Sequence, residues 1–344
     1  MCGPRDLGHL NRNSLTPCGG RPKIAAGSAV LQRQKGMGAT VDNSSRRIGV
    51  EICSTTLNAV VLDSSDKLQA ARNVPLDPDI SLAEQLAQAV ANLAPDAGCK
   101  AIGVAVPGLV DRKKHRVAYS ANMPENAAVD LVSDIKSATA LDVYIENDAN
   151  AAAYGEYKLG AGRGSKHMFY ATLGEGVGGA FIFNGELWRG AAGFAGEFGY
   201  VPINSEGIKL EEVASAANVV RRTKERFFQD STSSLNSLPN HTITLEAVID
   251  AAERNDDFAQ LMLHRTGSYV GTAIASVINL LNIEKIVVGG AIMRAQNVVL
   301  KAITERAKEI TFAPSFASTS ILAGELGDNA AAIGAAFLST QTSL

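Results

Sequence analysis

The sequence is poor in aromatic residues and has no long apolar run. Phe, Trp and Tyr make up only 6% of the 344 residues, with a single Trp. The longest apolar stretch near the start of the chain, residues 24–31, is interrupted by Gly27 and Ser28 and is far too short to span a membrane. No apolar segment follows the early arginines, so a secretory signal is not predicted. We expect no membrane association.

Cysteine is also scarce. The chain contains four cysteines without a CxxC pair, and its five histidines are widely dispersed. This spacing does not support a structural zinc site. Four scattered thiols suit a reducing compartment, so we expect a cytoplasmic protein. The cysteines are Cys2, Cys18, Cys53 and Cys99.

Positive charge is not in excess. The 32 Lys and Arg residues against 35 Asp and Glu give a net charge of -3, which excludes a generally polybasic nucleic-acid binder. Residues 1–47 hold eight of the basic and two of the acidic residues, leaving 24 against 33, a net charge of -9, in residues 48–344. A basic leader thus precedes an acidic body.

The leader, residues 1–47, has no sustained apolar period, so we expect it to lack a packed core. Three interpretations stay open: a disordered extension, an organelle transit peptide that would direct import, or sequence upstream of a start at Met37. A helix-turn-helix domain is not expected, because the apolar spacing for three packed helices is missing.

The body alternates strand-like and helix-like segments, which predicts an α/β fold, and the chain length allows about two domains. Ser81 and Glu84 form a capping box at the start of one helix. We predict strands over 48–52, 57–63, 101–106, 143–146, 168–173, 180–183 and 285–288, and helices over 81–93, 149–159, 266–281 and 329–338.

The two halves of the body echo each other. Each opens with a β-hairpin whose turn suits a phosphate, at residues 53–56 and at the Gly-rich loop 174–179. No GxGxxG sequence lies between a strand and a helix, so a Rossmann sheet is not predicted. The pattern indicates a duplicated nucleotide-clamping architecture, although tight turns also select glycine.

Two acids and two amides gather in residues 144–150, at a predicted strand-to-helix junction. On spacing alone Asn147 or Asp148 serves as a helix N-cap, and catalysis is the alternative. In the second hairpin Glu175 opposes a phosphate unless a metal or other cation intervenes.

Five segments in order resemble the ROK family of repressors, open reading frames and sugar kinases, over residues 48–340. They are Val-Pro-Gly-Leu-Val-Asp at 106–111, Glu-Asn-Asp-Ala-Asn-Ala-Ala at 146–152, Leu-Gly-Glu-Gly-Val-Gly-Gly at 173–179, the Gly-rich run at 189–200 and Val-Gly-Gly at 288–290. The ordered set is far more specific than any one motif.

The resemblance implies an actin-like ATPase fold, in which two ribonuclease-H-like domains hold ATP and a hexose in an interdomain cleft. The first lobe would be residues 48–154, completed by a C-terminal helix at 327–342, and the second lobe 155–326. It further implies ATP- and Mg²⁺-dependent phosphorylation of glucose or a relative at the 6-hydroxyl, by a homodimer with no nucleic-acid partner.

The resemblance also implies residue roles. Asp148 matches the catalytic base, which takes the proton of the attacking hydroxyl. Substrate would be bound by Gly108, Asn122, Asn147, Glu197 and Glu211. The nucleotide would be bound by Glu51, Thr55, Gly174, Gly176, Gly289 and Gly290.

Four positions depart from the family. Its first phosphate loop, Asp-x-Gly-Gly-Thr-Lys, reads Glu-Ile-Cys-Ser-Thr-Thr at 51–56, and the Thr of its Gly-Thr-Gly is Glu175. Its zinc-binding His is Tyr200, and its Cys-rich zinc loop is absent. We therefore expect a member without structural zinc. The altered phosphate loops leave two alternatives to a kinase open: a sugar sensor or structural partner, and a transcription regulator.

Overall fold

The first half of the described chain is built on a five-stranded sheet in the order β3-β2-β1-β4-β7. The computed structural model describes residues 46–93, 98–112, 114–120 and 129–340. β1 pairs antiparallel with β2 and parallel with β4, so the centre of the sheet is buried on both faces. The strands are β1 (Arg47–Ile52), β2 (Thr56–Leu62), β3 (Leu68–Pro75), β4 (Ala101–Val106) and β7 (Asp142–Asn147). A small ribbon pairs β5 (Leu109–Asp111) with β6 (Arg116–Tyr119).

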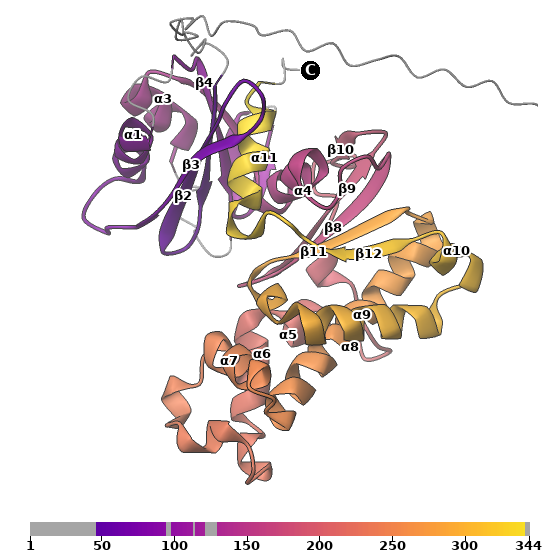
Figure 1. Ribbon diagram of the computed structural model, residues 1–344. Coiled ribbons are helices and arrows are strands. Elements are labelled where there is room, and N and C mark those ends of the chain that lie inside the picture. Colours follow the sequence, from indigo (N-terminus) through magenta and orange to yellow (C-terminus); the bar gives the residue numbers. More distant parts are fainter. Residues whose placement is uncertain (1–45, 94–97, 113, 121–128, 341–344) are drawn as a thin grey trace, which may run out of the picture. The chain divides into compact units, whose positions relative to one another are not determined.

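A second five-stranded sheet repeats this plan in the order β10-β9-β8-β11-β12 (Figure 1). β8 pairs antiparallel with β9 and parallel with β11, as β1 does with β2 and β4. The predicted duplication and its opening hairpins are therefore confirmed. The strands are β8 (His167–Leu173), β9 (Val177–Phe183), β10 (Glu186–Trp188), β11 (Lys285–Gly289) and β12 (Ser320–Ala323).

Ala-rich helices cover the first sheet because small residues let backbones approach. α11 (Ala330–Leu338) packs on β1 and β4 and also against α4 (Asp148–Leu159). A Cβ built on Gly49 would lie 1.8 Å from the carbonyl oxygen of Ala332. Only glycine fits there. The other helices of this half are α1 (Leu82–Leu93) and α3 (Leu131–Thr139).

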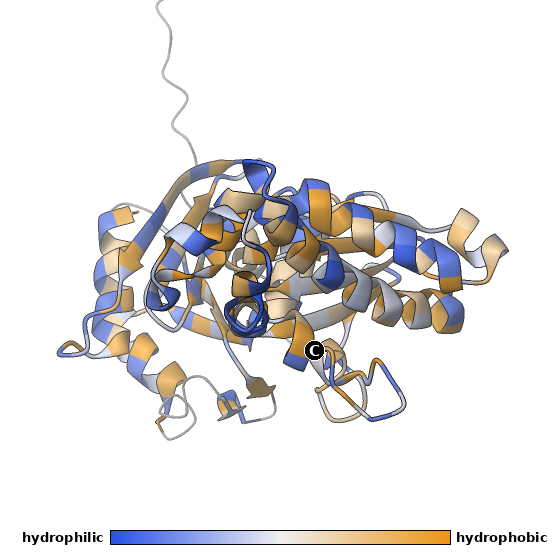
Figure 2. Ribbon diagram, turned by 90° about the horizontal axis from the view of Figure 1, so that it is seen from below, coloured by the Kyte–Doolittle hydropathy of each residue, from blue (hydrophilic) through white to orange (hydrophobic). Residues whose placement is uncertain are grey.

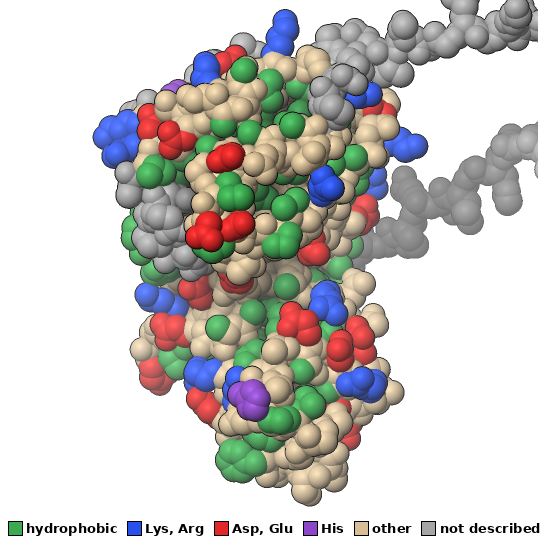
Figure 3. Space-filling view, turned by 90° about the vertical axis from the view of Figure 1, so that its left-hand side faces the viewer, with side chains coloured by type: hydrophobic (Ala, Val, Ile, Leu, Met, Phe, Trp, Pro, Cys, Tyr) green, Lys and Arg blue, Asp and Glu red, His purple; other side chains and the backbone are tan. Residues whose placement is uncertain are grey.

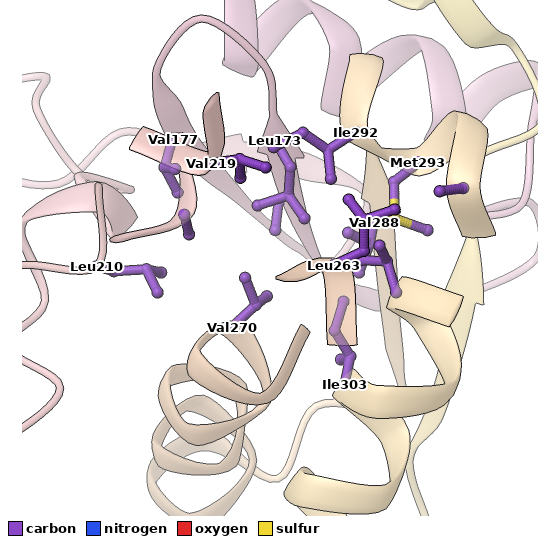
Figure 4. Close-up of a cluster of buried hydrophobic side chains, with 14 of the residues drawn as sticks. Leu173, Val177, Leu210, Val219, Leu263, Val270, Val288, Ile292, Met293 and Ile303 are labelled. Carbon is purple, nitrogen blue, oxygen red and sulfur yellow. The ribbon is translucent and has the colours of Figure 1, made fainter. Parts of the chain in front are cut away.

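The second half has a helical layer beside its sheet. Leu173 and Val288 of the sheet meet Leu263 and Ile303 of α8 and α9 in one buried cluster (Figure 4). The helices show apolar and polar residues in bands, as expected when one face is buried (Figure 2). They are α5 (Glu211–Ala214), α6 (Ala216–Lys224), α7 (Leu245–Glu253), α8 (Asp257–Leu281), α9 (Gln296–Ile310) and α10 (Ala313–Ala317). Short 3₁₀ turns are η2 (Phe198–Tyr200), η3 (Phe227–Gln229), η4 (Ser234–Ser237), η5 (Asn240–Thr242), η6 (Ala291–Ala295) and η7 (Gly327–Asn329).

Three predicted boundaries differ from the structure by three residues or more. β9 begins at Val177, so the second hairpin turns over 174–176 only and its later glycines belong to the strand. α8 begins nine residues before the predicted start at 266, because the Asp256 side chain accepts a hydrogen bond from Ala259 N at 2.9 Å and caps it. The last helix covers 330–338, preceded by a 3₁₀ turn rather than extending from 327.

Where the structure is described, it contains no helix with the length and apolarity that crossing a membrane requires. On the face in Figure 3, acidic and basic side chains are interspersed.

Candidate active site

The candidate site is built around Asn147 and Asp148, at the junction of β7 and α4. Asn147 is the N-cap, as predicted: its Oδ1 accepts a hydrogen bond from Asn150 N at 3.0 Å. Its Nδ2 donates to the carbonyl oxygen of Gly108 at 3.0 Å and to Oδ1 of Asp148 at 2.9 Å. The capping residue therefore also holds the carboxyl group of Asp148 in place. Helix capping and catalysis are thus compatible roles for this segment.

Gly108 is required by the backbone at this point. Its φ is 109°, and a Cβ would lie 2.2 Å from the carbonyl oxygen of Tyr119. An L side chain is strained in that conformation and blocked by that carbonyl. The structure therefore gives Gly108 a direct contact with Asn147. Asn122, the remaining predicted substrate ligand of this lobe, lies outside the described residues.

Asp148 titrates close to neutrality. Burial raises its pKa from 3.8 to about 6, the charge of Glu197 adds to the rise, and the hydrogen bonds from Ala149 N and Asn147 oppose it. A carboxylate with a pKa near the working pH is well matched to accept a proton.

Two further carboxylates from the second half face this group. Glu211 at the start of α5 accepts a hydrogen bond from Val177 N at 2.8 Å through Oε2. Partial burial, and then the charge of Glu211, raise the pKa of Glu197. Since Glu197 in turn acts on Asp148, the structure brings these three predicted residues into one electrostatic group.

The first hairpin places Glu51 on β1 beside the same group. Burial raises the pKa of Glu51 to about 8, and the charges of Asp148 and Asp328 contribute. The hairpin closes through Cys53 N donating to Thr56 O at 2.9 Å, which leaves Thr55 exposed. Asp328, in the turn before α11, also belongs to this group, although no role was predicted for it.

A side-chain contact joins the tips of the two hairpins. Ser54 Oγ donates to Glu175 Oε1 at 2.6 Å. Gly174 N closes the second turn on Gly176 O at 3.0 Å, and a Cβ on Gly174 would meet nothing within 4 Å. Burial raises the pKa of the Cys53 thiol to about 12, which disfavours the thiolate form at neutral pH.

The end of β11 lies against the same turn. Gly290 has a φ of 91°, and a Cβ there would lie 2.5 Å from the carbonyl oxygen of Leu173. Gly290, one of the predicted nucleotide residues, is therefore held beside the residue before Gly174 by a close backbone approach that only glycine permits.

An ion pair that sequence reasoning missed crosses between the two halves. Arg189, after β10, donates from Nη2 to Glu146 Oε2 at 2.6 Å and from Nε at 3.0 Å. Glu146 is the residue before Asn147 and is 2% exposed. Both residues stand in motifs singled out above, but no local pattern pairs them.

The position of the missing zinc ligand is a surface position. Tyr200 is 61% exposed, and Lys209 Nζ lies 4.2 Å from the centroid of its ring. Where the resemblance implies a zinc loop, the chain makes a short turn, in which Ile203 N donates to Ile208 O at 2.9 Å. Within the described ranges, no group of three or more His, Cys, Asp or Glu side chains is arranged to hold a metal ion.

Two sheets of identical strand order, each opening with a hairpin, and polar groups collected between the hairpins and the β7–α4 junction define a protein of the actin-like ATPase fold. Residues 47–342 match the ROK family, and the chain belongs to it.

Known members of the family are similar over most of the chain. The glucokinase of Thermotoga maritima is 29% identical over 305 residues, which cover 84% of this chain and 95% of that enzyme. The xylose repressor of Bacillus spizizenii is 31% identical over 69% of this chain and 60% of the repressor. The crystal structure of the ROK family glucokinase from Streptomyces griseus with glucose and AMPPNP has a TM-score of 0.77 at 28% identity, covering 86% of this chain and 100% of that one.

Proposed function

We propose that the protein is an ATP-dependent sugar kinase that phosphorylates glucose or a close relative at its 6-hydroxyl. The observation that carries the proposal is the position of Asp148: a partly buried carboxyl with a pKa of about 6, held by Asn147 and grouped with Glu197 and Glu211. The similarity to glucokinases supports the same reaction.

In this proposal Asp148 accepts the proton of the attacking sugar hydroxyl, because its carboxylate is populated near neutral pH. Asn147 orients that carboxylate through its 2.9 Å hydrogen bond. Glu197 and Glu211, together with Asn122 and the Gly108 segment, supply the directed acceptors that sugar hydroxyls need.

The residues present fit a magnesium-bound nucleotide. Mg²⁺ takes one or two carboxylates together with substrate phosphates and water, and the charges of Asp148 and Asp328 both act on Glu51 here. The turns with Thr55, Gly174 and Gly176, and the glycines Gly289 and Gly290, would hold ATP. When bound, ATP supplies the phosphoryl group and Mg²⁺ neutralises its charge.

We also propose that the chain forms two lobes. The first consists of residues 48–154 and is completed by residues 327–342, and the second consists of residues 155–326. The protein would act as a homodimer in the cytoplasm.

The experiment that tests the proposed reaction is ADP release by the full chain with glucose, mannose, fructose, N-acetylglucosamine and N-acetylmannosamine. Turnover with at least one sugar is expected. No sugar-dependent ADP release with any of them would overturn it.

A second function, sugar sensing without phosphoryl transfer, is favoured by the Ser54–Glu175 contact at 2.6 Å. A carboxylate there opposes a triphosphate. The similarity to a xylose repressor supports a regulatory role of this kind. Calorimetric titration with ATP, with and without glucose, separates the two: tight sugar binding with no ATP binding would favour the sensor, and a DNA shift assay would test the regulator.

A further inference from the structure

The interface between α6 and α8 contains a buried arginine. Arg222 is 8% exposed and points from α6 towards α8. Its Nη2 donates to Thr266 Oγ1 at 2.5 Å, and its guanidinium lies 5.6 Å from the ring centroid of Tyr269. The hydroxyl of Thr266 donates in turn to Met262 O at 2.9 Å. One nitrogen of the guanidinium, Nη2, is therefore anchored on α8.

Among the described residues, the guanidinium of Arg222 forms no salt bridge with an acid. Arg222 Nε is buried without a hydrogen-bond partner among the described residues. Residues 213–224 and 258–281, which include all of α6 and nearly all of α8, contain no Asp or Glu. The nearest acid along the chain, Glu225, is held by Arg221 at 2.9 Å. A buried cation is costly unless it is paired, so this position favours the binding of an anion.

Further positive charges surround the same position. Arg226 lies in the turn that follows the end of α6 at Lys224, and Arg265 precedes Tyr269 by one turn on α8. Burial lowers the pKa of Arg222, and the charges of Arg226, Arg221 and Arg265 lower it further. Arg226 is exposed and Arg265 half-buried, so the group is open to solvent on one side.

We propose that Arg222, Arg226 and Arg265 bind a phosphate-class oxyanion between α6 and α8. The unpaired N–H groups of the Arg222 guanidinium form the base of the site, since a planar array of N–H donors matches a phosphate. Tyr269 covers one face of this arginine. Arg226 and Arg265 neutralise the remaining charge. The ligand is inorganic phosphate or a phosphorylated small metabolite.

This site differs from the proposed catalytic group and does not depend on its function. α6 nevertheless links the two, because Ala216 N at its first residue donates to Gly174 O at 2.8 Å. An anion bound near the last turn of α6 therefore lies on the helix that supports the second hairpin.

The test is thermal unfolding of the full chain titrated with sodium phosphate at ionic strength held constant with sodium chloride. The wild type is expected to gain stability with phosphate. Arg226→Gln combined with Arg265→Gln should weaken the apparent phosphate affinity at least about tenfold. Arg254→Gln, which removes an exposed charge at the end of α7, serves as the matched control and should respond like the wild type.

A second variant, Arg222→Met, tests the buried arginine itself, independently of the substitutions at Arg226 and Arg265. It should abolish the phosphate response while leaving the melting temperature in phosphate-free buffer at or above that of the wild type, because an unpaired buried charge is removed. A loss of stability that is equal at every phosphate concentration would show that Arg222 only supports the fold, and would overturn the site. An unchanged phosphate response in the Arg226/Arg265 variant would also overturn it.

Glucose 6-phosphate in place of inorganic phosphate distinguishes the sources of the anion. If glucose 6-phosphate stabilises the wild type at lower concentrations than inorganic phosphate does, and Arg222→Met abolishes this stabilisation, the ligand is a phosphorylated metabolite. If the two compounds stabilise the wild type equally, the ligand is free phosphate.

Discussion

Arg189 Nη2 lies 2.6 Å from Oε2 of Glu146 and joins the segment after β10 to the strand that ends beside Asp148. The other carboxylate oxygen of Glu146 accepts hydrogen bonds from Asn147 N and Asn150 Nδ2, each at 3.1 Å. One buried carboxylate thus connects the second half of the chain to the N-terminus of α4. The ion pair positions the N-cap that in turn holds Asp148.

Removing the cation of this pair should destabilise the protein and impair the site. Arg189→Met leaves the charge of Glu146 buried and unpaired, which we expect to cost about 3 kcal/mol of unfolding free energy. Urea denaturation measures this loss. The double variant Arg189→Met, Glu146→Gln should recover most of it, since no charge is left unpaired. Equal losses in the single and double variants would contradict the assignment.

Activity should depend on pH through Asp148. Its carboxylate form is the active one and its pKa is about 6, so turnover should rise with pH through about 6 and level off above it. The pH profile of kcat/KM at saturating Mg²⁺ measures this. An acid limb near the ordinary aspartate pKa of about 4 would show that Asp148 is not the titrating base.

Glu51 should lower stability at high pH. Its pKa is about 8 in the folded state against 4.5 ordinarily, so the folded protein binds more protons than the unfolded chain between these values. The cost is absent below about pH 4.5, grows as the pH rises and is complete above about 8. Glu51→Gln, measured without Mg²⁺, should therefore be more stable than the wild type at pH 8.5 and equal to it near pH 4. A gain that does not vary with pH would contradict this.

Glu175 should weaken nucleotide binding. Glu175→Thr removes a carboxylate from the turn and ends its contact with Ser54, so ATP should bind about tenfold more tightly. Calorimetry with ATP and Mg²⁺ gives the affinity, and Ser54→Ala is the matched control, because it breaks the same contact but keeps the charge. If both variants bind ATP equally well, the hydrogen bond rather than the charge is the obstacle.

The central strands were predictable because they are buried runs of apolar residues with clear turns between them. β3 was missed because most of its residues are exposed and it lacks an apolar alternation, and β10 because it is only three residues long. These edge strands are specified by pairing with a neighbour rather than by local sequence.

The contacts of the site also divide into those that local sequence predicts and those that depend on residues far apart in the chain. The N-cap role of Asn147 depends on residues within one helical turn, so it was predictable. The partners in the Arg189–Glu146 and Ser54–Glu175 contacts are 43 and 121 residues apart, and no local pattern brings them together. Asp328 likewise joins the site only when η7 comes to lie beside β2, where Asn58 Nδ2 donates to its carbonyl oxygen.

The most direct test of the account compares glucose-dependent ADP release by the wild type and by Asp148→Asn, with sugar affinity measured on both. Asparagine keeps the size of the side chain but cannot accept the proton. We predict a fall in turnover of about 10²–10⁴-fold with glucose affinity nearly unchanged. Equal turnover in the two proteins would contradict the central claim that Asp148 is the catalytic base of a sugar kinase.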